Sequence, residues 1–154
     1  MRDGKTLDLK KYRGKVLAVL MVSTTCRDCA GAVDFFGKVQ KEFQARGFQV
    51  IGVALGPDAP QNVGPFIDRY QPAFPMGYLD EQAARKLGDM KSDYVPTVPF
   101  VMFVDSTSTV RIQYDAKDPV FKEADKAFRS IVNSLINLRD SKAGNAKAGS
   151  AAKH

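Results

Sequence analysis

Residues 16–29 read VLAVLMVSTTCRDC, an unbroken apolar run that leads into the only two cysteines of the chain, Cys26 and Cys29. An apolar run without polar alternation is typical of a central strand that is covered on both faces of a sheet. Beyond the cysteines, apolar side chains recur at helical spacing as far as Phe43, and Gly47 is placed to end a helix. The stretch therefore predicts a buried strand that delivers a Cys-x-x-Cys pair to the start of a helix.

The segments that follow predict an α/β fold. With the helix over 29–46, a second buried strand over 48–55 completes a βαβ unit, whose strands should be parallel and whose crossover should be right-handed. A continuous apolar strand over 100–104 and a half-exposed strand over 110–114 are expected to form a hairpin.

Shorter elements fill the rest of the chain. A short strand is expected over 5–9. Glycines and prolines within 56–75 predict turns around one short helix near 66–70, and another short helix is expected over 81–87. A closing helix is expected over 118–138, because an Asp-Pro pair supplies an N-cap and a proline at the first helical position.

Length and composition predict one domain with a tail. The 154 residues, 44% of them hydrophobic, fit one domain over 1–139, and the Lys/Ala/Gly-rich residues 140–154 are expected to be disordered. No apolar run approaches the roughly 20 residues that span a bilayer, and no signal peptide is visible. The net charge is +6, of which three lysines and one aspartate in the tail supply 3 − 1 = +2. No basic run with interleaved aromatics is present, so nucleic-acid binding is not expected.

The cysteine pair predicts thiol–disulfide exchange. Cys26 would lie at the exposed start of the helix, where the peptide dipoles and the Arg27 cation favour its thiolate and Asp28 opposes it mildly. Cys29, one turn deeper, would then resolve the mixed disulfide by attacking Cys26. Cys26 and Cys29 are therefore the candidate catalytic residues, in a two-electron reaction that needs no bound cofactor.

Two other uses of the cysteines are weaker. A structural disulfide across two intervening residues would close a very small loop and restrict the unfolded chain little. A zinc site usually needs four ligands, and the remaining candidate, His154, is the last residue of the tail. No metal site is predicted. Pro99 begins the strand over 100–104, and its peptide bond with Val98 could be cis or, as more commonly, trans.

Together, the strand, the Cys-x-x-Cys helix and the later segment PFVMFVD over 99–105 resemble the thioredoxin superfamily. The details resemble its TlpA/ResA-type thiol–disulfide oxidoreductases, which are related to the AhpC/TSA redoxins. DGKTLDLKKYRGK over 3–15 is similar to the segment that leads into their cysteine strand, and 66–80 is similar to their inserted helix and strand. The resemblance spans residues 3–138.

This resemblance implies a thioredoxin-like fold, with a central mixed sheet and helices on both faces. It implies a thiol–disulfide oxidoreductase that acts on protein thiols and disulfides, exchanges electrons with an upstream redox partner and needs no cofactor. A monomer is expected. A periplasmic or extracytoplasmic location is implied by the family alone, whose members often carry an N-terminal signal or anchor.

The resemblance also assigns a substrate-binding groove. Pro99 would pack in the cis form against the cysteine pair, and the backbone of Val98 would hydrogen-bond an extended substrate segment. The six-residue spacing to Asp105 assigns this role to Pro99 rather than Pro96. Thr25, directly before the first cysteine, and Arg27, directly after it, complete the expected substrate-binding set.

The chain departs from the family at three positions. Thr25 stands where most relatives have a tryptophan directly before the first cysteine. Leu20 occupies the position of thioredoxin's buried acid, and Ala32 that of the glutamate of ResA-type proteins. No carboxylate is therefore expected at either position that assists proton transfer in the family, and the redox poise is left open.

Two rival functions are weighed. A peroxiredoxin-like thiol peroxidase is supported by Ser23 at the position of that group's hydroxyl, but Val19 replaces its proline and a second cysteine three residues on is unusual there. The other rival is a non-catalytic copper carrier or partner module. Copper chaperones of the superfamily take a third ligand, commonly His, from a distant loop, and this sequence has none there.

Overall fold

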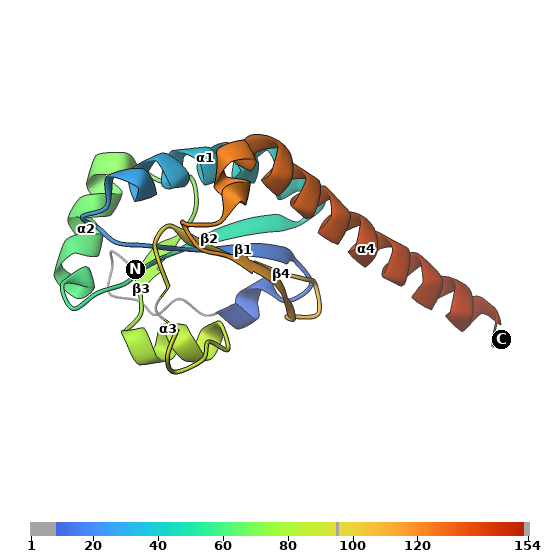
Figure 1. Ribbon diagram of the computed structural model, residues 1–154. Helices are drawn as coiled ribbons and strands as arrows, with labels where there is room; N and C mark the ends of the chain where they lie inside the picture. Colours follow the sequence, from blue (N-terminus) through green and yellow to red (C-terminus); the bar gives the residue numbers. More distant parts are fainter. Residues whose placement is uncertain (1–8, 95, 153–154) are drawn as a thin grey trace.

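The centre of the molecule is a mixed five-stranded sheet with the order β3-β2-β1-β4-β5 (Figure 1). The computed structural model describes residues 9–94 and 96–152, with side chains described from 10 to 142. The strands are β1 (Val16–Val22), β2 (Phe48–Ala54), β3 (Met76–Tyr78), β4 (Phe100–Val104) and β5 (Val110–Tyr114). β2 is parallel to both β1 and β3, whereas β4 is antiparallel to both β1 and β5. Every residue of β1 is buried, as its unbroken apolar run predicts.

Helices cover both faces of this sheet, as expected. The α-helices are α1 (Arg27–Phe43), α2 (Ala59–Tyr70), α3 (Glu81–Leu87) and α4 (Ala124–Ala152), and the 3₁₀ helices are η1 (Leu9–Tyr12), η2 (Gln44–Arg46) and η3 (Pro119–Glu123). Figure 1 shows α1 and the first half of α4 on one side of the sheet and α3 on the other. The predicted α/β class with a mixed sheet is confirmed.

Each face of the sheet has its own hydrophobic core. Under α1 and α4, the rings of Phe36 and Phe103 lie 5.4 and 5.6 Å from that of Phe128, centre to centre. On the opposite face, Ala84 of α3 belongs to the same buried cluster as Met102 of β4. Burial of each large apolar side chain stabilises the fold by roughly 1.5–3 kcal/mol, so the two cores hold the sheet rigidly between the helices.

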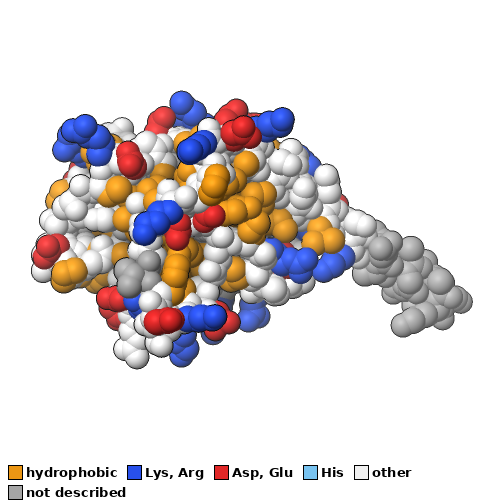
Figure 2. Space-filling view, in the orientation of Figure 1, with side chains coloured by type: hydrophobic (Ala, Val, Ile, Leu, Met, Phe, Trp, Pro, Cys, Tyr) orange, Lys and Arg blue, Asp and Glu red, His pale blue; other side chains and the backbone are white. Residues whose placement is uncertain are grey.

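The outer side of the sheet at β5 is less covered. The side chains of β5 are half-buried or exposed. Figure 2 shows hydrophobic side chains gathered on this side of the molecule, over the region where Figure 1 draws β4, with charged side chains around them.

The buried Gln40 of α1 replaces a missing strand at the start of β2. β3 pairs with β2 from Gly52 onward. Before that point, the Gln40 side chain accepts a hydrogen bond from the Val50 N–H at 2.5 Å and donates one to the Phe48 carbonyl at 3.4 Å. The amide satisfies two backbone groups that would otherwise be buried without a partner, each of which would cost about 1–3 kcal/mol.

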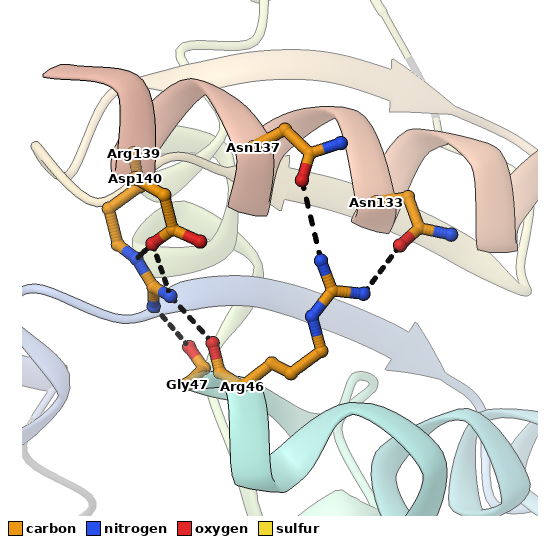
Figure 3. Close-up of polar contacts among 6 residues, drawn as sticks. All are labelled: Arg46, Gly47, Asn133, Asn137, Arg139 and Asp140. Carbon is orange, nitrogen blue, oxygen red and sulfur yellow. Dashed lines mark hydrogen bonds and ion pairs between the residues drawn. The ribbon is translucent and has the colours of Figure 1, made fainter. Parts of the chain in front are cut away.

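Polar contacts fix α4 to the segment that follows α1 (Figure 3). The Arg46 guanidinium donates hydrogen bonds to the side-chain oxygens of Asn133 at 2.6 Å and Asn137 at 3.4 Å. In return, Arg139 donates to the carbonyl of Arg46 at 2.7 Å and to that of Gly47 at 3.4 Å. Gly47 has a φ of 83°, in the left-handed region that favours glycine.

The middle of the chain corrects one prediction. Instead of a short helix near 66–70, α2 starts at Ala59 and has 12 residues. Pro60 lies in its first turn, where no intrahelical N–H bond is lost, and Pro65 removes one bond from the interior. The prolines were therefore misleading as signals of turns. The three-residue strand β3 was expected only from the family resemblance.

The ends of the predicted elements also shift. α1 begins at Arg27 rather than Cys29, because Cys26 is its N-cap. The expected strand over 5–9 lies outside the described residues, apart from Leu9, which begins η1. The closing helix starts as the 3₁₀ helix η3 and continues as α4.

The C-terminal segment differs from the disordered tail expected over 140–154. α4 is helical to Ala152, and Figure 1 shows its second half projecting away from the sheet. Alanine and lysine have high helix propensities, which accounts for a continuous helix where the composition alone predicted disorder. The division of the chain into a domain and a tail at residue 139 stays a prediction.

Candidate functional site

Cys26 lies where the chain leaves β1 and enters α1. Its backbone is extended, with φ −90° and ψ 121°, and it is the N-cap of α1. The Sγ atom of Cys26 accepts a hydrogen bond from the N–H of Cys29 at 3.2 Å. The sulfur therefore lies at the N-terminal end of the helix, toward which the positive end of the helix dipole points. The side chain is half-buried and therefore within reach of a partner.

Cys29 is in a different environment, although both cysteines are free thiols. Its side chain is fully buried in the core under α1. Burial, followed by the hydrogen bond with Cys26, raises the pKa of Cys29 from 9.0 to about 12. The Cys29 thiol is therefore protonated at neutral pH and shielded from solvent, whereas the Cys26 sulfur is in a partly exposed position.

The peptide bond between Val98 and Pro99 is cis, as the resemblance implies. The Cys26 Sγ lies 3.9 Å from the carbonyl oxygen of Val98, close enough for a weak S–H hydrogen bond. Both Val98 and Cys26 pack at the edge of the same core. The fold thus brings Cys26 and Cys29 together with Val98 and Pro99, a pair that lies far from them in the sequence.

A polar link holds the loop before Pro99 to the loop after β5. The Tyr94 hydroxyl donates to Asp115 Oδ2 at 2.8 Å, and the Ala116 N–H donates to the Thr97 carbonyl at 3.3 Å. Partial burial alone would raise the pKa of Asp115, but the hydrogen bonds from Tyr94 and from the Lys117 N–H lower it overall. Asp115 is therefore a stable carboxylate that ties the two loops together.

A hollow of about 360 Å³ opens beside Pro99, between α1 and the start of α4. It is mostly apolar, and its lining is Asp28, Gly31, Ala32, Phe35, Phe36, Pro99, Ala116, Phe121, Ala124 and Phe128. Asp28 is the charged residue among them. Ala32, at the family's glutamate position, is part of this apolar wall.

A second hollow, of about 280 Å³, lies between the segment that precedes Cys26 and α2. Its lining is Thr24, Thr25, Asn62, Pro65, Phe66, Arg69 and Tyr70. Thr25 lines this hollow, in a position where a tryptophan would be far larger. We call this space the Arg69 hollow. The sequence did not indicate this hollow, because it predicts mainly turns where α2 lies.

The remaining residues named from the sequence lie close to the cysteines in the chain but make few contacts with them. Arg27 is the exposed first residue of α1. The Ser23 and Thr25 hydroxyls lie 3.1 Å apart. Leu20 is fully buried in β1, where it places an apolar side chain rather than a carboxylate. The negative charge of Asp28 adds a minor contribution to the raised pKa of Cys29.

Metal ligands do not gather in the part of the chain that the structure describes. Among those residues, no group of three or more His, Cys, Asp or Glu side chains could hold a metal ion. The absence of a metal and of a cofactor stays a prediction.

Comparison with known families identifies the chain's relatives. The sequence model described as "AhpC/TSA family" matches residues 1–126. The chain belongs to the AhpC/TSA family. No curated protein matches this AhpC/TSA-family chain.

Solved structures resemble this AhpC/TSA-family protein over most of their length. A thiol:disulfide interchange protein of the thioredoxin family from Chlorobium tepidum TLS is 22% identical, with a TM-score of 0.71 over 88% of this chain and 89% of that one. The thioredoxin domain of a thiol-disulfide oxidoreductase from Bacteroides vulgatus is 17% identical, with a TM-score of 0.62 over 80% and 86%. MTB dsbF is 18% identical, with a TM-score of 0.65 over 87% and 90%. These matches show that the fold is thioredoxin-like.

Proposed function

We propose that this protein is a thiol–disulfide oxidoreductase that exchanges disulfides with protein substrates, with Cys26 as nucleophile and Cys29 as resolving thiol. The observation that carries the proposal is the asymmetry of the pair. Cys26 is half-buried and caps α1, whereas Cys29 is fully buried and has a pKa of about 12. Membership of the redoxin family supports the same chemistry.

In the reducing direction, the Cys26 thiolate attacks one sulfur of a substrate disulfide. A mixed disulfide forms, and the other substrate sulfur leaves as a thiolate that takes up a proton. Cys29 then loses its proton and attacks the Cys26 sulfur, which releases the second substrate thiol and leaves a Cys26–Cys29 disulfide. An external dithiol restores the reduced pair, and the reverse sequence would oxidise a substrate dithiol.

The substrate segment would lie along Val98 and Pro99. The Val98 carbonyl is close to Cys26, and an extended segment that hydrogen-bonds this backbone would bring its own sulfur to the Cys26 Sγ. Thr25 and Arg27, the residues directly before and after Cys26, would complete the substrate-binding set.

Cysteine variants test this proposal directly. Cys26→Ser is expected to abolish dithiol-driven reduction of a peptide disulfide, because no nucleophile remains at the helix start. Cys29→Ser is expected to accumulate a mixed disulfide through Cys26, which mass spectrometry of the non-reduced protein detects. Alkylation of the reduced wild type at pH 8 should modify Cys26 before Cys29.

The peroxidase alternative is an outcome of the same experiment. If Cys29→Ser turned over hydrogen peroxide with a thiol reductant at the wild-type rate and no peptide disulfide were reduced by the wild type, the protein would be a one-cysteine peroxidase. Faster alkylation of Cys29 than of Cys26 would reverse the two roles.

Partners and location belong to this proposal as well. A protein substrate, an upstream redox partner and a monomeric state are proposed, and light scattering checks the last of these. None of the helices in the described residues is long and apolar enough to cross a membrane. An extracytoplasmic location is proposed on the family resemblance, and fractionation of cells that express the full-length protein tests it.

A further inference from the structure

We propose that the Arg69 hollow is a specificity site that receives an acidic side chain of the substrate, next to the substrate's reacting cysteine. This inference rests on the proposed function, because it assigns a substrate class to the same cysteine. The occupant is the carboxylate of an Asp or Glu residue in a peptide segment that crosses Cys26.

The position of the hollow points to the substrate. Thr24 and Thr25 form part of its wall, and Thr25 is bonded directly to Cys26. Consecutive Cα atoms are about 3.8 Å apart, so the wall of the hollow begins one residue before Cys26 in the chain. A substrate residue one or two positions from the cysteine can therefore reach into it.

The charge of the hollow selects an anion. Among the described residues that line it, Arg69 is the charged one and none carries a carboxylate. Within the described residues, the exposed Arg69 forms no ion pair, and its guanidinium carbon lies 5.3 Å from the centre of the Tyr70 ring. A guanidinium presents a planar fork of donors that matches a carboxylate with two hydrogen bonds.

Neighbouring side chains hold this fork in place. The Tyr70 ring packs against the buried Phe66 with ring centres 4.7 Å apart, and both belong to α2. The cation therefore rests on an aromatic surface that is itself anchored in a helix. Asn62 and the two threonines add neutral polar groups around it.

The hollow beside Pro99 has the opposite preference. Its lining is mostly apolar, and its charged residue is Asp28. A substrate segment that passed over Cys26 with an acidic residue toward Asp28 would meet repulsion, whereas the same residue toward Arg69 would meet attraction. The two hollows together fix the direction in which an acidic substrate segment crosses the cysteine.

Paired peptides test the proposal. Two disulfide-containing peptides would differ only in carrying Glu or Gln at the positions that flank the reacting cysteine. Wild-type kcat/KM is expected to be about threefold higher for the Glu peptide, since a partly exposed ion pair is worth up to about one kcal/mol. Arg69→Gln should bring the ratio to about one, and Arg69→Glu should invert the ratio. Raising the salt concentration should lower the wild-type ratio.

A matched control separates local recognition from overall charge. Arg13 is exposed before the start of β1, at the end of the strand opposite Cys26, so that Arg13→Gln makes the same charge change away from the site. Arg13→Gln should keep the wild-type ratio. Equal kcat/KM for both peptides in the wild type, or a ratio that Arg69→Gln leaves unchanged, would overturn the Arg69 assignment while leaving the exchange activity established. If neither peptide were reduced, the proposed function itself would fail.

Discussion

At the scale of single residues, Cys29 and Tyr94 hold protons that the unfolded chain would release. Burial first, and then a hydrogen bond with Cys26, raises the pKa of Cys29 from 9.0 to about 12. Burial and the hydrogen bond with Asp115 raise the pKa of Tyr94 from 10.0 to about 12. Between pH 9 and 12 the folded state therefore binds more protons than the unfolded state, and stability falls as the pH rises.

Urea unfolding of the reduced protein at a series of pH values measures this effect. Stability is expected to be retained in full below about pH 9 and to decrease progressively above it. Cys29→Ser and Tyr94→Phe should each flatten the decrease, because each removes one such proton. Tyr78→Phe, at a ring that is 48% exposed, is the control and should leave the slope unchanged. If neither Cys29→Ser nor Tyr94→Phe altered the slope, the loss of stability would not come from these two groups.

The residues that the sequence revealed are those with a local signal. Cys26 and Cys29 were identified because they follow a buried strand and begin a helix, and Pro99 because it opens another strand. Arg69 carried no such signal, since it reaches the site only through the placement of α2. The same is true of the Tyr94–Asp115 hydrogen bond, whose partners belong to two different loops.

At the scale of elements, Gly47 controls how α1 is followed by β2. Gly47→Ala is expected to destabilise the protein by roughly 1–2 kcal/mol, because a side chain is strained at its φ of 83°. An added Cβ would also meet the Nη1 atom of Arg139, which fixes α4 at this point. Chemical denaturation measures the free energy of unfolding.

Gly31 in α1 is the matched control. Its φ is not in the left-handed region, and nothing lies within 4 Å of the place where its Cβ would be. Gly31→Ala should therefore raise stability by roughly 0.5–1 kcal/mol, as expected for a helix interior. The two substitutions should have opposite signs. Two changes of the same sign would refute the explanation by backbone conformation.

Most elements could be predicted because their periodicity is strong. β1, β2, β4, β5, α1 and α3 have the types and nearly the bounds that the apolar pattern indicates. The predicted helix is shorter than α2 because Pro60 and Pro65 are usual signals of breaks, although a proline in the first turn costs no hydrogen bond. β3 is too short to show alternation. The role of Gln40 could not be predicted from the sequence, because its hydrogen bonds with Phe48 and Val50 depend on how α1 packs on β2.

At the scale of the whole molecule, the contacts that bind α4 to the body lie in its first part. Among the described side chains, the last to contact a distant segment is Arg139, which bonds to Arg46 and Gly47. A chain that ends after Lys142 is expected to keep the melting temperature and the disulfide-exchange rate of the full chain. It should lose helical signal in circular dichroism, because α4 continues to Ala152.

Calorimetry of the two chains gives the comparison of melting temperatures. A fall of several degrees on truncation would contradict the division of the chain at residue 139 and would mean that the last part of α4 stabilises the domain.

Leu20 and Ala32 bear on the lifetime of the mixed disulfide between Cys26 and a substrate. By the family resemblance, both occupy positions where relatives carry a carboxylate that assists proton transfer, so the proposed loss of the Cys29 proton would receive no help from either position. The covalent link between Cys26 and a captured substrate should therefore last longer than in a relative that carries the acid. A long-lived link gives a correct partner time to settle into the groove, and it lets a poorly bound one leave by the reverse attack before the second cysteine commits the exchange. Slow resolution would thus act as a proofreading interval.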